Sequence, residues 1–170
     1  MTKGYSTSDN RRFKGHPTRN IVGTLGENLV AQWLRGSQVR VLHQRWRCRL
    51  GELDIVAGFP ATRDTAKTLA FVEVKTRSVG NWDHDGRLAL SAAKCQRLNQ
   101  AARFFLAHFP QYAQLPCRFD LALVRCQPAP ESASPSPITP KLPDVITIGQ
   151  PVRVNQLQLT LQDYLVGVLD

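Results

Sequence analysis

The 170-residue sequence lacks the cysteine patterns of a zinc site or a disulfide framework. Cys48, Cys95, Cys117 and Cys126 form no Cys-x-x-Cys pair, and no histidine lies at zinc-ligand spacing from any of them. The last three fall in segments with periodic apolar residues, where a reduced cysteine behaves as a small hydrophobic side chain. We therefore expect structural thiols, with a catalytic thiol as the less favoured alternative.

Long apolar runs are missing as well. No stretch approaches the roughly 18 residues of a membrane span, and the polar N-terminus has no signal-peptide core. No basic amphipathic helix with a broad apolar face is evident, which argues against a membrane-surface protein. These absences predict a cytoplasmic protein without a membrane partner. The length fits one globular domain, so fold and function must share a single core.

Acidic residues are scarce: 13 Asp and Glu stand against 22 Lys and Arg, which gives a net charge of +9. Such an excess favours a polyanionic partner, nucleic acid above all. Residues 1–20 carry five basic residues, one acidic residue and few apolar ones, and we expect them to form a basic disordered tail. The remainder keeps a net charge of +5, so the folded part is basic too.

Residues 21–126 carry the pattern of a compact core domain. A helix is predicted from Thr24, which forms a capping-box pattern with Glu27, to Gly36. A longer helix is predicted from Ser91 to Phe109. Strands are predicted over residues 39–46, 53–57, 69–77 and 118–125.

The C-terminal third changes in composition. Residues 127–143 hold six of the eleven prolines and three serines, which is typical of an extended linker or insertion. Residues 144–170 are expected to complete the core, with extended segments at 145–148 and 152–154 and a short helix from Thr160. The order of elements predicts an α/β (α+β) fold, in which helices flank a central mixed β-sheet.

Carboxylates concentrate on two neighbouring predicted strands. Because side chains alternate across a strand, Glu52 and Asp54 are expected on one face, with Leu53 and Ile55 on the other. If the two strands form a hairpin, positions that sum to about 127 pair, and Asp54 lies opposite Glu73. Facing carboxylates destabilise a sheet by a few tenths to roughly 1 kcal/mol, so a compensating cation is expected.

A divalent cation would meet that need. Carboxylate oxygens suit Mg²⁺, which keeps several waters and is commonly shared with substrate phosphates. The same alternation places Glu73, Lys75 and Arg77 on one face, and Lys75 could orient an attacking water. The residues alone leave alternatives open: a Glu-x-Lys pair is often a solvated strand face, and Glu27 can be no more than the end of the capping box.

The combined order of five motifs closely resembles the UPF0102 (YraN-like) family over roughly residues 21–125. The family is similar in turn to the restriction-endonuclease-like PD-(D/E)xK superfamily, especially to archaeal Holliday junction resolvases. The resemblance implies a restriction-endonuclease-like fold and metal-dependent cleavage of nucleic acid. The motifs are Gly23-x-x-Gly26-Glu27, Gly51-Glu52-Leu53-Asp54, Phe71-Val72-Glu73-Val74-Lys75-Thr76-Arg77, Lys94-x-x-Arg97-Leu98 and Arg118-Phe119-Asp120.

By position, the resemblance implies that Asp54 and Glu73 are ligands of Mg²⁺ or Mn²⁺. It implies that Lys75 is the catalytic lysine and that Glu27 is a further acidic catalytic residue. Three more positions match as supporting residues: Glu52, Arg77 and Asp120, the last as a partner of Arg118 or of Arg77. The sequence departs from the family pattern at Arg45, where an Asn is usual.

Basic residues follow the proposed catalytic strand. Lys94 and Arg97 share a helix face at a spacing of three residues, and with Arg87 they are candidates for contacts with nucleic-acid phosphates. A solvated helix face is an equally good interpretation. The leading hypothesis is a Mg²⁺-dependent endodeoxyribonuclease that acts on DNA, including structured or branched DNA. The alternative is a non-catalytic nucleic-acid-binding protein with the same fold, and analogy with resolvases suggests a homodimer.

Overall fold

The computed structural model describes residues 19–78, 90–130 and 142–169. The predictions for the N-terminal tail, for most of the proline-rich segment and for Arg87 therefore lie outside the described residues. The elements are α1 (Arg19–Gly36), β1 (Arg40–Cys48), β2 (Gly51–Phe59), β3 (Thr68–Ser78), α2 (Ala92–His108), the short 3₁₀ helix η2 (Pro110–Tyr112), β4 (Cys117–Pro128), β5 (Pro151–Val154) and β6 (Leu157–Leu169).

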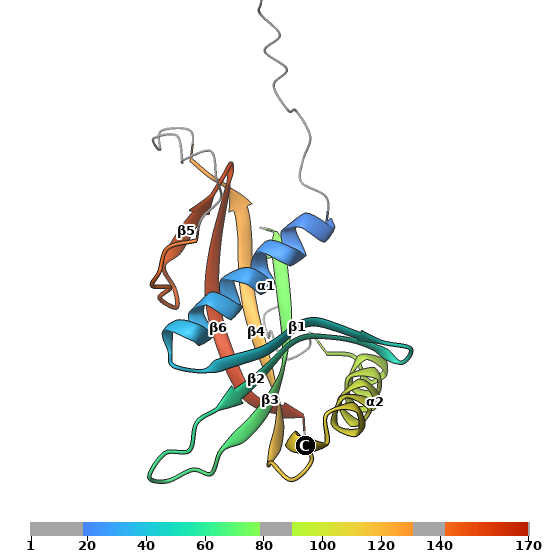
Figure 1. Ribbon diagram of the computed structural model, residues 1–170. Helices are drawn as coiled ribbons and strands as arrows, with labels where there is room; N and C mark the ends of the chain where they lie inside the picture. Colours follow the sequence, from blue (N-terminus) through green and yellow to red (C-terminus); the bar gives the residue numbers. More distant parts are fainter. Residues whose placement is uncertain (1–18, 79–89, 131–141, 170) are drawn as a thin grey trace, which may run out of the picture.

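The strands form one six-stranded sheet in the order β1-β2-β3-β4-β6-β5 (Figure 1). The pairing of β3 with β4 is parallel, and every other pairing is antiparallel. A parallel pair needs a crossover connection, and α2 lies in it. The predicted mixed central sheet flanked by helices is confirmed.

The two long helices cover opposite faces of this sheet, because neighbouring residues of β3 belong to different cores. Val72 packs in the core under α1, and Phe71 packs in the core under α2. Figure 1 shows α1 lying across the sheet and α2 near the β1–β2 hairpin. The α1-side core includes Leu29, Leu34, Ile55, Val72, Leu159 and Leu161, and the α2-side core includes Leu53, Val56, Phe71, Leu98 and Phe105. Neither helix is long and apolar enough to cross a membrane within the described chain.

The second helix forms where the sequence predicts it. Ser91 is its N-cap, and the side chain accepts a hydrogen bond from the backbone N–H of Lys94 at 3.3 Å. Phe109 is the C-cap, and Pro110 opens the following 3₁₀ turn. The four strands predicted in the core domain also form, with ends that differ from the prediction by one to three residues: β1 begins one residue later than predicted, and every other end extends beyond it.

The capping-box prediction for the first helix is wrong. The helix already runs from Arg19, so Thr24 lies inside it, and the Thr24 hydroxyl donates a hydrogen bond to the Asn20 carbonyl at 2.8 Å. A threonine hydroxyl can bond to the carbonyl four residues earlier only within a formed helix. Glu27 is therefore not a capping residue, and its carboxylate is available for the site described below.

The predicted C-terminal helix is also wrong. From Leu157 the chain forms the long strand β6, which pairs with β4 along most of its length. The physical reason is the period-2 alternation of Leu157, Leu159 and Leu161, which suits a half-buried strand, together with the apolar edge of β4 that needs a partner. The extended segment predicted at 152–154 forms β5, whereas residues 145–148 are not in a strand.

Strict alternation fails in β2 at Asp54. Leu53 packs in the α2-side core and Ile55 in the α1-side core, so the prediction that these two residues share a face is wrong. The cross-strand pairs Trp46–Leu53 and Gln44–Ile55 flank the irregular position. The residue between them on β1 is Arg45, whose φ of 52° lies in the left-handed region that non-glycine residues rarely adopt.

Candidate metal and phosphodiester site

Two carboxylates meet where β2 and β3 separate. The predicted register is confirmed, since Ile55 pairs with Val72 and the positions sum to 127 throughout this pair of strands. Asp54 and Glu73 come next in that register. Asp54 Oδ2 accepts a hydrogen bond from the backbone N–H of Val74 at 2.8 Å, which holds this carboxylate against β3.

Glu73 is buried and held by two lysines. Its side chain is 3% exposed, Oε1 lies 2.5 Å from Lys75 Nζ, and Oε2 lies 2.8 Å from Lys94 Nζ. The contact with Lys94 is an ion pair without hydrogen-bond geometry, so Oε2 has no hydrogen-bond partner among the described residues. Lys94, predicted as a phosphate contact, lies within the carboxylate cluster in this structure.

The pKa of Asp54 is raised by its surroundings. Burial, and next the negative charge of Glu73, raise the pKa of Asp54 from 3.8 to about 7, while the Val74 N–H and Lys94 oppose the shift. Because burial is the largest cause, the ionised form of Asp54 is disfavoured mainly by its withdrawal from water. Lys94 offsets only part of this effect.

A third carboxylate, Glu27, reaches the cluster from α1. Its side chain is 11% exposed, and Oε2 lies 3.1 Å from Arg45 Nε. The same guanidinium lies 3.6 Å from Glu52 Oε1 and donates a hydrogen bond to the Thr24 hydroxyl at 2.9 Å. Burial raises the pKa of Glu27 and Arg45 lowers it, with Glu52 and Glu73 adding smaller increases. Arg45 thus links α1 to β2 at the edge of the cluster.

The approach of α1 to β3 depends on Gly26. A Cβ at this position would overlap Thr76 Oγ1 and would lie 3.1 Å from Thr76 Cβ, so only glycine allows the helix to come this close. Glu27 follows Gly26 directly in α1. The glycine therefore sets the position from which the Glu27 carboxylate enters the site.

Asp120 serves a different part of the molecule. It is fully buried and aligns with Val72, whose side chain lies in the α1-side core, on the face opposite Glu73. Of the two partners considered for it, Arg118 is present, with Nε 3.1 Å from each carboxylate oxygen. The Tyr164 hydroxyl donates at 2.7 Å and the Gly167 N–H at 3.0 Å. Asp120 therefore joins β4 to β6 and takes no part in the carboxylate cluster.

The remaining predicted residues lie around the cluster. Glu52 is paired with Arg47, 3.2 Å away, as well as with Arg45. Arg97 is exposed on α2, one turn after Lys94, and Arg77 is half-buried farther along β3. The structure thus brings Glu27, Asp54, Glu73, Lys75 and Lys94 together, with Glu52 beside them.

The donor set fits a hard divalent cation. Glu73 Oε2 and Glu27 Oε2 are buried oxygens without a hydrogen-bond partner among the described residues, and burial together with the charge of Glu73 disfavours the ionised form of Asp54. No three His, Cys, Asp or Glu side chains in the described chain stand close enough to hold a metal ion by themselves. Mg²⁺ is usually bound through one or two carboxylates with several waters, and Asp54 and Glu73 could supply those carboxylates.

Arg45 is the site residue that sequence reasoning missed. It was noted only as a departure from a family pattern, because neither its spacing nor its neighbours in the chain indicate contacts with Glu27 and Glu52. Those contacts arise from tertiary structure. The departure itself was the available signal, since asparagine is among the residues that best tolerate the left-handed conformation found there.

Replacing Arg45 with alanine is expected to lower the free energy of unfolding by about 1–3 kcal/mol, because the buried Glu27 carboxylate loses its nearest cation. Urea unfolding with metal chelated would measure the loss. The Arg45→Ala/Glu27→Gln double variant should recover much of it, since no unpaired charge remains. Equal losses in the single and double variants would show that the ion pair does not matter to stability.

Comparison with known proteins places the chain in a family. The sequence model of the Uncharacterised protein family UPF0102 matches residues 26–124. A UPF0102 protein of Acaryochloris marina is 43% identical over 157 residues, covering 87% of this chain and 90% of its own. One from Synechocystis is 42% identical over 147 residues, covering 85% and 94%. One from Thermosynechococcus vestitus is 49% identical over 106 residues, covering 62% and 82%. The matched region contains the whole carboxylate and lysine cluster, and the chain belongs to the UPF0102 family.

Proposed function

We propose that this protein is a metal-dependent endonuclease that hydrolyses phosphodiester bonds in DNA, and that branched DNA is the first substrate to test. The observation that carries the proposal is the cluster itself. Asp54 and Glu73 lie close together inside β2 and β3, just past the last paired residues of the two strands, and Lys75 follows Glu73 on the same face. The resemblance to the PD-(D/E)xK superfamily, drawn from the sequence motifs, assigns these three positions the same roles.

Asp54 and Glu73 would hold Mg²⁺ or Mn²⁺ through their carboxylate oxygens. The cation supplies Lewis-acid polarisation of the scissile phosphate and lowers the pKa of a nearby water. Lys75 Nζ, which now lies against Glu73 Oε1, would orient the attacking water. Lys94 would be released from Glu73 as the carboxylate takes the cation, and its ammonium group could then contact a phosphate.

Glu27 would act from the α1 side as a further acidic group. Its carboxylate is held by Arg45, whose positive charge offsets part of the repulsion that Glu27 experiences from Glu52 and Glu73. An ordered carboxylate at that position could accept a hydrogen bond from a water in the hydration shell of the cation. The basic surplus of the chain would attract the polyanionic substrate and make binding weaken steeply with salt.

A second candidate is a nucleic-acid-binding protein that does not cut. The observation that favours it is the pairing of Glu73 with two lysines, which neutralises this carboxylate without a metal ion. Such a protein would bind DNA in a salt-sensitive manner and would need neither Mg²⁺ nor the Asp54 carboxylate.

The test is a cleavage assay on end-labelled single-stranded, duplex, flap and four-way-junction DNA, with Mg²⁺, Mn²⁺ or EDTA. We expect cleavage of at least one substrate that EDTA abolishes and that Lys75→Met reduces by about 100-fold or more. Arg63→Met is the matched control, because Arg63 is an exposed cation in the loop after β2 and contacts none of the cluster residues. Salt-sensitive binding without cleavage of any substrate would favour the second candidate.

A further inference from the structure

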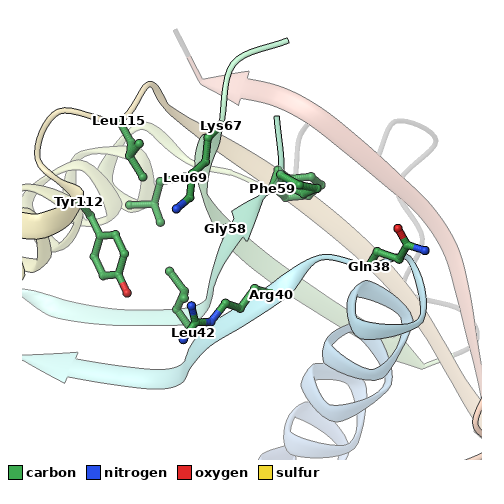
Figure 2. A pocket seen from close by; sticks show the side chains of 10 residues that line it. Gln38, Arg40, Leu42, Gly58, Phe59, Lys67, Leu69, Tyr112 and Leu115 are labelled. Atoms are coloured by element: carbon green, nitrogen blue, oxygen red, sulfur yellow. The ribbon is translucent and has the colours of Figure 1, made fainter. Parts of the chain in front are cut away.

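A second concave site lies at the opposite end of β2 and β3, away from the carboxylate cluster. Figure 2 shows the pocket between the starts of β1 and β3 and the turn that follows α2. Its volume is about 200 Å³. Pockets for drug-sized ligands measure roughly 300–1,000 Å³, so this one suits a single planar ring system.

The walls of the pocket are mostly apolar. Leu42, Leu69 and Tyr112 line it on the α2 side of the sheet, whereas Phe59 borders it from the end of β2 and packs its ring against the α1-side core (Figure 2). The Tyr112 ring is held from behind, since it stacks against Phe105 with centroids 6.1 Å apart. A fixed aromatic wall of this kind favours a flat, unsaturated ligand.

Charge at the rim limits what that ligand can be. Arg40 and Lys67 line the pocket and are exposed, and neither side chain makes a hydrogen bond or ion pair with another described residue. No acidic side chain lines the pocket, and Gln38 adds an amide that can both donate and accept. The pocket therefore joins an apolar slot for a ring to two free cations, which together match a base attached to a phosphate.

The pocket shares a face of the sheet with the cluster. Leu69 and Glu73 are both on the α2 side of β3, four residues apart, which is roughly 13 Å along a strand. That separation is short enough for one nucleic-acid strand to reach both places. An intact duplex keeps its bases stacked inside, so only an unpaired nucleotide could enter the slot.

We propose that this pocket binds one unpaired nucleobase of the DNA substrate, with the adjoining phosphate held by Arg40 and Lys67. The inference rests on the proposed function, and it adds that the protein selects DNA with unpaired nucleotides a short distance from the scissile bond. Tyr112 supplies a stacking surface that tolerates any base, so the pocket recognises the absence of pairing rather than sequence.

A larger side chain at position 58 would fill the pocket. Gly58 lines the pocket from β2, and a Cβ there would lie 3.7 Å from Leu42 Cδ1 and 3.9 Å from the Arg40 carbonyl oxygen, both ordinary contacts. Valine suits a strand and would extend into the slot. Arg40→Ala/Lys67→Ala removes the rim charges without touching the core, and Arg63→Ala removes an exposed charge of the same loop that does not line the pocket.

The experiment is fluorescence anisotropy in EDTA with a short single-stranded oligonucleotide and with copies that each carry one abasic position. For the wild-type protein, one abasic position should weaken binding about 5- to 10-fold. Gly58→Val should bind the intact oligonucleotide about as weakly as the wild type binds the abasic copy. In this variant, an abasic position should cause no further loss of affinity. Arg40→Ala/Lys67→Ala should weaken binding of every copy, Arg63→Ala should weaken it less, and duplex binding should be unchanged in Gly58→Val.

The proposal is overturned if no abasic position matters, or if both pocket variants bind single-stranded DNA as the wild type does. Circular dichroism and thermal melting establish that Gly58→Val is folded. If it is not, the rim variant decides, since its residues are exposed. Because binding is measured without metal, a positive result with no cleavage in any assay would refute the nuclease proposal alone. Normal cleavage by both pocket variants would refute the pocket alone.

Discussion

Asp54→Asn is expected to reduce cleavage by about 1,000-fold or more, while the metal-free protein becomes as stable as the wild type or more stable. The amide still accepts a hydrogen bond from the Val74 N–H, so the local geometry is kept. The charge that Asp54 would direct at the cation is lost, and so is its repulsion with Glu73. Loss of activity without loss of stability is the signature of a group retained for function.

The stability difference should depend on pH. The folded-state pKa of Asp54 is raised to about 7 from 3.8, so the fold favours the protonated form. The wild type therefore loses stability as pH rises from about 4 to about 7, and the uncharged variant escapes this loss. In EDTA, the melting temperatures of the wild type and Asp54→Asn should differ more above pH 7 than below pH 4. A variant that melts well below the wild type above pH 7 would contradict the assignment.

Asp64→Asn is the matched control. Asp64 is exposed in the loop after β2, and its carboxylate contacts none of the cluster residues in the described part of the chain. The same change of charge there should leave both cleavage and the melting temperature close to the wild-type values. Comparable losses of activity in the two variants would mean that general electrostatics, rather than a carboxylate at position 54, controls cleavage.

Gly26→Ala is expected to lower the free energy of unfolding by about 3 kcal/mol or more and to abolish cleavage with it. The new Cβ would overlap Thr76 Oγ1, and Thr76 lies in β3 beneath α1, so the helix must move away from the sheet. Glu27 would move with it. Urea unfolding and the cleavage assay measure the two effects.

Gly23→Ala, one turn earlier in the same helix, is the matched control. A Cβ at this position meets only Glu27 Oε1, at 3.9 Å. Alanine is the better helix former by roughly 0.5–1 kcal/mol, so this variant should be slightly more stable than the wild type. If both alanine variants behaved alike, the close approach of α1 to β3 would not be what requires glycine at position 26.

The sequence allowed most of the fold to be predicted where the signal is local. The spacing of apolar residues and Ser91 located α2, and the two apolar segments on either side of the 58–68 loop located the β2–β3 hairpin and its register. The predictions failed where distant contacts decide. Residues from Thr160 onward become β6 because β4 offers an apolar edge, and Thr24 lies within α1 because the helix continues upstream to Arg19.

The candidate site was predicted in part for the same reason. Asp54, Glu73 and Lys75 are neighbours in a hairpin, so their proximity follows from register alone. Glu27 enters from another element, and only the family resemblance placed it in the site. Arg45 and the contact of Lys94 with Glu73 depend on how the helices dock, which one sequence without an alignment does not reveal.

The family match ends at residue 124, inside β4, so a chain cut at this boundary would lack part of the sheet. The partner of β4 is β6, and Leu159 and Leu161 of β6 are fully buried in the α1-side core. A chain cut at the end of the match would contain every residue of the carboxylate cluster and yet expose a long apolar sheet edge, the kind that draws other chains into aggregates. We therefore expect residues 26–124 expressed alone to fold poorly and to aggregate, because the strands that complete the sheet lie outside the match.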